Sequence, residues 1–255
     1  MGNKRGVFGR SPASMLVWTT LITGLSCLGL PARPESTTPV ERTAVPAVTP
    51  SLQQNPGAGA QSITYYVRPD GGSAAQCTGR ANAPYPGSGT AQPCAWDHPF
   101  RALPPGGTPR IAGEDTLIIG AGSYMMGLGA PGADACDPTS AWDCHMPPIP
   151  SGSTGNPTRI LGASWDSGCS NWPQLWGTER ADMIINLTDA SHVELACLEL
   201  TDHSGCVESH ADASLACQRD NPPFGPWVPT GLYAEDSADV HLRDLNIHGF
   251  AHTGA

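Results

Sequence analysis

The chain has 255 residues, with 13 lysines and arginines against 23 aspartates and glutamates, and its net charge is −10. This acidity argues against nucleic-acid binding, because contact with a phosphate backbone needs clustered basic side chains. Glycine (30) and proline (26) far exceed their usual combined share of about 12%, and charged residues make up only 14%. The composition therefore favours short strands and long ordered loops over helices.

Residues 1–32 have the pattern of a secretory signal peptide. Lys4, Arg5 and Arg10 precede Ser14–Leu30, which carries no charge, and small residues follow up to Ala32. Two alternatives stay open. About 17 apolar residues reach the lower limit for an uncleaved membrane anchor, and Cys27 after Leu-Ser resembles the lipid-attachment box of bacterial lipoproteins. We expect a secreted or cell-envelope protein that meets a membrane only through this segment.

Residues 33–62 are rich in proline, threonine, serine and glutamine and have few large apolar side chains. Such a segment cannot bury enough surface to offset the cost of ordering, so we expect a disordered linker. The folded domain is predicted to span residues 63–255.

Eight cysteines remain if Cys27 is removed with the signal peptide, and an even number in an exported chain indicates a disulfide framework. Three pairs would close short loops: Cys77 with Cys94, Cys136 with Cys144, and Cys206 with Cys217. Elimination then leaves Cys169 with Cys197. The competing zinc hypothesis is weak because the chain has no Cys-x-x-Cys pair.

The start of the predicted domain resembles a known family. A β-prone run, Thr64–Val67, leads into a predicted turn at residues 68–72; Pro99–Leu103 and the glycine-bounded segment Gly113–Tyr124 follow. This order is similar to the opening of right-handed parallel β-helix proteins of the pectin-lyase-like superfamily, which includes pectate lyases and polygalacturonases. The resemblance implies an all-β solenoid with a polysaccharide or cell-surface glycan as its partner.

An internal repeat supports a solenoid without reference to the family. Residues 189–200 align with residues 236–247, and the copies share the pattern Val-x-Leu-x-x-Leu-x-(Leu/Ile). The apolar alternation slips once, so each copy is predicted to form two short strands joined by a bend at Cys197 or Asp244. Further rungs are expected at Thr158–Gly162 and Met183–Leu187, and more coils are expected after Ala255.

Asp202 and His203 follow the first copy and open a proline-rich insertion. The resemblance implies a weak catalytic or Ca²⁺ role, because pectate lyases carry an Asp-His pair after a strand and Ca²⁺ takes oxygen ligands. The structural alternative is an aspartate that caps a turn. His248 and His252 could suggest a metal site, but scattered surface histidines are the better interpretation.

Aromatic side chains in the predicted loops are the weak candidates for sugar binding, since aromatic faces stack on sugar rings. Trp227 and Phe224 lie in the insertion, and other tryptophans assigned to loops or their borders are Trp142, Trp165, Trp172 and Trp176. The alternative is that these rings anchor loops that have no core of their own.

Two functional hypotheses follow. The chain is the beginning of a polysaccharide lyase or glycoside hydrolase whose catalytic coils lie beyond residue 255, or it is a non-catalytic glycan-binding or scaffold protein of the cell envelope. Ca²⁺ is a possible cofactor only in the first case.

Overall fold

The computed structural model describes residues 61–179, 181–203 and 227–250. Within them the fold is all-β, apart from two short 3-10 helices, η1 (Pro99–Arg101) and η2 (Ala141–Asp143). The strands in chain order are β1 (Thr64–Gly72), β2 (Thr116–Ile119), β3 (Ser123–Met126), β4 (Thr158–Gly162), β5 (Gln174–Gly177), β6 (Met183–Asn186), β7 (Ser191–Asp202), β8 (Thr230–Tyr233) and β9 (Ala238–Ile247).

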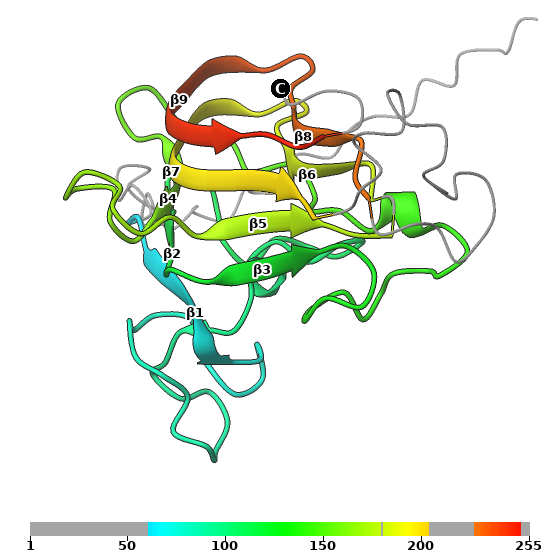
Figure 1. Cartoon of the computed structure of the whole chain (residues 1–255). Coiled ribbons are helices and arrows are strands. Elements are labelled where there is room, and N and C mark those ends of the chain that lie inside the picture. Colours follow the sequence, from blue (N-terminus) through cyan, green and yellow to red (C-terminus); the bar gives the residue numbers. More distant parts are fainter. Residues whose placement is uncertain (1–60, 180, 204–226, 251–255) are drawn as a thin grey trace, which may run out of the picture. The chain divides into compact units, whose positions relative to one another are not determined.

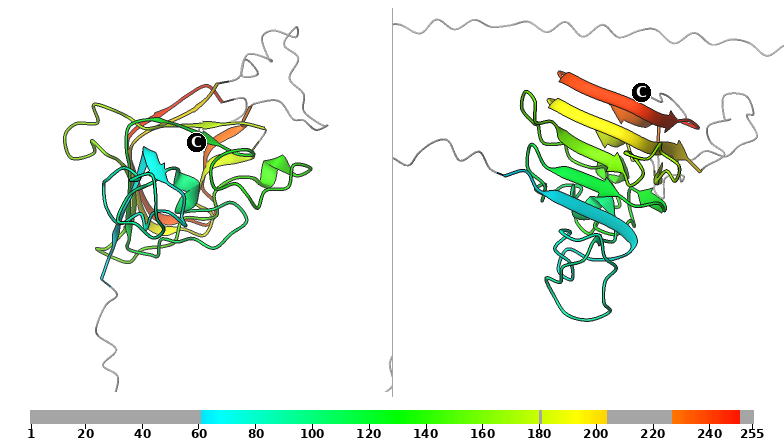
Figure 2. Two further views of the ribbon diagram at one scale, coloured as in Figure 1. Left: turned by 90° about the horizontal axis from the view of Figure 1, so that it is seen from below. Right: turned by 90° about the vertical axis from the view of Figure 1, so that its left-hand side faces the viewer.

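The strands form a curled, parallel, seven-stranded sheet and a separate parallel pair, β6 with β8 (Figure 1). The first half of β7 pairs with β4, whereas its second half pairs with β5. We call β1, β2, β4 and the first halves of β7 and β9 the first flank. The second flank comprises β3, β5 and the second halves of β7 and β9. The curl is visible along the stack in the left view of Figure 2, and this solenoid-like arrangement is compatible with the predicted β-helix.

The two flanks meet at a bend inside each long strand. Cys197 in β7 and Asp244 in β9 adopt φ angles of 56° and 50°, in the left-handed region that lets a strand change direction. In β4 the matching position is Gly162, where a Cβ atom would lie only 2.1 Å from the Cys197 carbonyl oxygen. Glycine is therefore required there, and the predicted bends at Cys197 and Asp244 are confirmed.

The sequence repeat sets the register of the last two coils. Strands β7 and β9 pair Val193 with Val240 and Leu200 with Ile247, which is the alignment expected from the repeat. The four apolar residues of the first copy point inward and are fully buried: Val193, Leu195, Leu198 and Leu200. A slipped alternation thus keeps one continuous apolar row on the inside of two flanks.

A small second core lies on the outer surface of the first flank. Leu161 and Ala196 point away from the main core but have no exposed surface, because Trp165 packs against them. The loop that carries Trp165 ends near Cys169, which forms a disulfide with Cys197 at the bend. The disulfide therefore fastens a covering loop to the corner of the sheet.

The described residues form three disulfides, and each joins cysteines paired in the sequence analysis: Cys77–Cys94, Cys136–Cys144 and Cys169–Cys197. Disulfides of this number are typical of an oxidising extracellular or envelope compartment. Cys206 and Cys217 lie outside the described residues, as do the predicted signal peptide with Cys27 and nearly all of the predicted linker.

The predicted turn at residues 68–72 falls inside β1, which extends to Gly72. The ladder with β2 ends at Val67, and both Val67 and Gly72 bridge to Trp96, so the chain bends between these two residues. No helix in the described part of the chain is long and apolar enough to cross a membrane.

The paired positions Leu195 and Leu242 give a matched test of the inner row. Leu195 has no exposed surface, whereas its register partner Leu242 is 46% exposed. We expect Leu195→Ala to lower the free energy of unfolding by about 2–5 kcal/mol, because it leaves a cavity, and Leu242→Ala to cost less than about 1 kcal/mol. Urea denaturation of the two variants measures the difference; equal losses would contradict the assigned inner row.

Candidate functional site

The outer surface of the second flank carries two columns of aligned side chains. In β5, Leu175 and Gly177 are buried, so Gln174 and Trp176 point outward. Strand register aligns Ser123, Gln174, Glu199 and Asn246 in one column, and Met125, Trp176 and Thr201 in the other. His248 extends the second column, since its backbone N–H donates to the Leu200 carbonyl. We call these eight residues, together with His203, the polar-aromatic face.

A stacked aromatic pair lies on this face. The rings of Trp176 and His203 have centroids 4.3 Å apart and planes only 19° from parallel. The His203 Nε2 atom lies 2.7 Å from the Gln174 Oε1 atom, which also accepts a hydrogen bond from the Ser123 hydroxyl at 3.2 Å. Because this chain of contacts fixes both rings, the exposed His203 ring and the half-buried indole form one preorganised surface.

A carboxylate and a second histidine lie in the neighbouring coil. The Glu199 Oε1 atom is 2.9 Å from His248 Nε2, and the Nδ1 atom of that imidazole is 3.3 Å from the Thr201 hydroxyl. The Glu199 side chain is 22% exposed and the His248 side chain 50% exposed, so both can be reached from solvent. The face thus combines ring surfaces with hydrogen-bonding groups of both kinds.

The Asp202 side chain connects two strands that are distant in sequence. Asp202 is largely buried, at 8% exposed, and its Oδ2 atom accepts a hydrogen bond from the Val228 backbone N–H at 3.1 Å. This contact connects the end of β7 to the segment that enters β8. It is a structural role, but it joins distant segments and does not cap a local turn. The Ca²⁺ role remains a prediction, because residues 204–226 lie outside the described part of the chain.

The tryptophans divide into different environments. Trp227 is 6% exposed, so it offers little surface for stacking, and Phe224 lies outside the described residues. Trp165 covers the first flank, and Trp142 is 42% exposed on η2. Assigning Trp176 to a loop or its border was wrong, because it is paired within β5. In the short run Gln-Leu-Trp-Gly, the β-propensity of tryptophan is the one local signal that could have indicated a strand.

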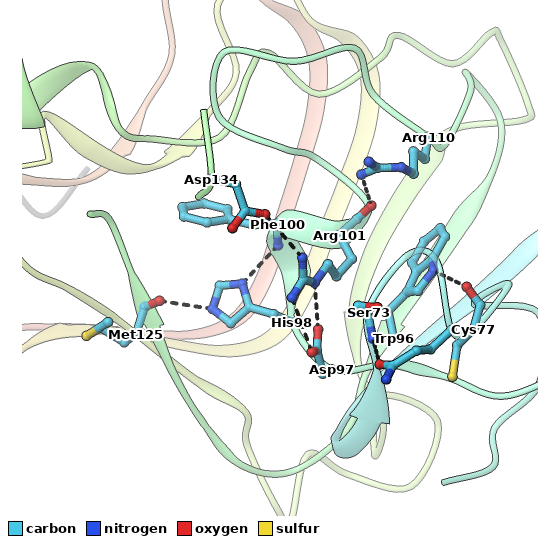
Figure 3. Close-up of polar contacts among 11 residues, drawn as sticks. Ser73, Cys77, Trp96, Asp97, His98, Phe100, Arg101, Arg110, Met125 and Asp134 are labelled. Atoms are coloured by element: carbon cyan, nitrogen blue, oxygen red, sulfur yellow. Dashed lines mark hydrogen bonds and ion pairs between the residues drawn. The ribbon is translucent and has the colours of Figure 1, made fainter. Parts of the chain in front are cut away.

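His98 is a buried histidine that serves the fold (Figure 3). Its Nδ1 atom accepts a hydrogen bond from the Phe100 backbone N–H at the start of η1, and its Nε2 atom is 2.9 Å from the Met125 carbonyl oxygen. Since a carbonyl only accepts, Nε2 carries the proton and the ring is neutral. Burial lowers the pKa of His98 from 6.5 to about 4, although the Met125 hydrogen bond opposes the shift. With both nitrogens engaged inside the fold, this residue joins η1 to β3.

A metal centre finds no support in the part of the chain that the structure describes. The one group of three close metal-binding side chains there is Cys169, Cys197 and Asp244, and both cysteines are used in a disulfide. His248 contacts Glu199 and Thr201 instead of a second histidine, and His252 lies outside the described residues.

Comparison of the chain with protein-family models, with curated proteins and with solved structures finds no significant match.

The neutral state of His98 gives a prediction for pH dependence. In the unfolded chain the imidazole gains a proton near pH 6.5, whereas in the folded chain it does so only near pH 4. Its contribution to stability is therefore complete above pH 6.5 and is lost as the pH falls through this window, by about 3 kcal/mol in total.

We expect the wild-type free energy of unfolding to fall more steeply between pH 7 and 4.5 than that of His98→Asn, by about 2–3 kcal/mol. Asparagine keeps an acceptor for the Phe100 N–H but does not titrate. Chemical denaturation at a series of pH values measures both slopes, and parallel curves would show that the folded state does not hold His98 neutral.

Proposed function

We propose that this chain belongs to an exported glycan-binding protein and that the polar-aromatic face is its binding surface. The observation that carries the proposal is the Trp176–His203 stack, bordered by Gln174 on one side and by Glu199 and His248 in the next coil. Pyranose rings present C–H groups on their faces and hydroxyl groups at their edges. A ring surface with donors and acceptors beside it suits both parts of such a ligand.

The arrangement of the face suits a polymer. Its residues are aligned from coil to coil on parallel strands, so an extended ligand along the stack would meet side chains of successive coils. Solenoids commonly use surfaces of this kind for extended ligands. The stack is also held in place by hydrogen bonds before a ligand arrives, which lowers the ordering cost of binding.

Binding without hydrolysis is the form of the proposal that the face supports. Hydrolysis of a glycosidic bond canonically uses two carboxyl groups on either side of that bond. The nine residues that define the polar-aromatic face include one carboxylate, Glu199, and it is already paired with His248. A polysaccharide lyase or glycoside hydrolase activity is the alternative.

The finer assignment of fold is part of the same proposal. We propose a right-handed parallel β-helix of the pectin-lyase-like type, preceded by a signal peptide or anchor over residues 1–32 and a linker over residues 33–62. The curled parallel sheet, the repeat that sets its register and the three disulfides support this assignment.

The Trp176→Ala variant tests the binding surface. Loss of the indole removes the main apolar contact, so binding to the preferred polysaccharide should weaken at least about tenfold. Affinity electrophoresis and titration calorimetry against xylan, β-glucan, galactan, alginate and polygalacturonate identify the polymer and measure the loss. Trp142→Ala is the matched control, because Trp142 is exposed on η2 and lies outside the face.

Two results would decide against the proposal. The absence of binding to every polymer would exclude a glycan-binding protein of this range, and equal weakening in both tryptophan variants would exclude this face as the surface. Release of unsaturated products or new reducing ends, assayed with and without Ca²⁺, would favour the enzyme alternative.

A further inference from the structure

A cavity of about 500 Å³ lies where the first flank turns into the second, close to the start of β3. Its polar side chains are Arg68, Asp70 and Asn82, and small residues, including Pro69, Ala121 and Ala163, form the rest of the lining. We call it the corner pocket. Its volume falls within the range of about 300–1,000 Å³ that is usual for small-molecule sites.

The polar groups of the corner pocket are ordered by each other. Arg68 donates to both carboxylate oxygens of Asp70, from Nε at 2.7 Å and from Nη2 at 2.9 Å, and its Nη1 donates to the Asn82 side-chain oxygen at 3.2 Å. These hydrogen bonds lower the pKa of the Asp70 carboxyl and raise that of the Arg68 guanidinium, so the pair stays fully charged at neutral pH.

Hydrogen-bonding capacity remains for a ligand. Arg68 has five N–H groups, of which three are used within the described part of the chain. The Asn82 amide adds two further donors, and each Asp70 oxygen keeps a lone pair that can accept. Donors and acceptors therefore lie side by side, as sugar hydroxyl groups require because each hydroxyl both donates and accepts.

Glycines let the connection between β2 and β3 lie close to β1 beside the pocket. A Cβ atom at Gly120 would lie 3.1 Å from the Val67 carbonyl oxygen, and one at Gly122 would lie 2.5 Å from the Pro69 ring. The wall formed by Asn82 belongs to the loop closed by Cys77–Cys94, and this loop is tied to β1 by the hydrogen bond from Tyr85 N–H to the Asp70 carbonyl. The concave shape is thus fixed by the backbone and a disulfide.

We propose that the corner pocket binds one neutral sugar unit, and that it makes the protein select neutral glycans over uronic-acid polymers. The choice of a sugar as ligand rests on the proposed function. The selectivity rests on charge: Asp70 neutralises Arg68, and a uronate carboxylate bound to the guanidinium would meet the Asp70 carboxylate at close range. Ser123 follows Gly122 directly, so the pocket adjoins the polar-aromatic face.

The test is nuclear magnetic resonance of the full chain with methyl glycosides of neutral pentoses and hexoses and with methyl galacturonate. We expect the Arg68 Nε–H and Asn82 side-chain amide signals to shift with a neutral glycoside and to saturate at millimolar concentration. The same shifts should need at least about tenfold more of the uronate. Because the signals belong to pocket residues, the readout is independent of polymer binding at Trp176.

Asp70→Asn should weaken the preference of the corner pocket for neutral sugars over uronates. The variant leaves the Arg68 charge without its partner, so affinity for neutral glycosides should fall about tenfold and binding of methyl galacturonate should appear. The Asp70 side chain is 56% exposed, and the spectrum of the variant reports its fold directly. Asp137→Asn, which changes an exposed aspartate in the loop closed by Cys136–Cys144, should behave like the wild type.

The inference is overturned if no neutral glycoside moves the pocket signals, if the wild type binds the uronate as well as the neutral sugar, or if Asp70→Asn leaves the selectivity unchanged. Should any of these occur while a polymer still binds through Trp176, only the corner pocket is excluded. Pocket shifts in a protein that binds no polymer would instead exclude the polar-aromatic face and leave the pocket as a monosaccharide site.

Discussion

The structure depends on how a long strand bends while its inward-facing apolar side chains stay in one row. At the corner, strands β7 and β9 each place one residue in the left-handed conformation, Cys197 and Asp244, and the apolar alternation slips by one residue at that point. Two further left-handed positions, Asp189 and His192, recur 47 residues later as Asp236 and Asp239. Since the corners stack on each other, each coil is held to the geometry of the coil before it, and the parallel register follows.

The corner also determines what lies on the outside. Once the inner row is buried, the alternate residues of the second flank must point outward, and the register aligns them from coil to coil. On the first flank the same rule would leave Leu161 and Ala196 in solvent, but the loop with Trp165 covers them and the Cys169–Cys197 disulfide fastens that loop to the corner. This apolar part of the first flank is thereby covered, whereas Glu199 and His248 on the second flank can be reached from solvent.

The parts of the fold with a repeated pattern could be predicted, and the parts made by loops could not. The alignment of residues 189–200 with 236–247 predicts the pairing of β7 with β9, because both copies have the same apolar row and the same bend. The strand character of Trp176 was missed because its run is only four residues long and its neighbours in β3 and β7 are distant in sequence. Similarly, Asp202 followed a family-like pattern, and no local signal indicates that its carboxylate accepts a hydrogen bond from the backbone of Val228, 26 residues later in the chain.

By itself, the sequence determined the all-β class, the bends at Cys197 and Asp244 and the pairs Cys77–Cys94 and Cys136–Cys144, because each depends on local periodicity, local conformational preference or short loop closure. The pair Cys169–Cys197 followed only by elimination. Only the tertiary structure decided that His203 stacks on Trp176, that Glu199 meets His248 and that Arg68 meets Asn82. Most of these contacts join residues from different coils or from a coil and a loop. They exist because stacking brings those positions together, and the sequence carries no local signal for which outward side chains will become neighbours.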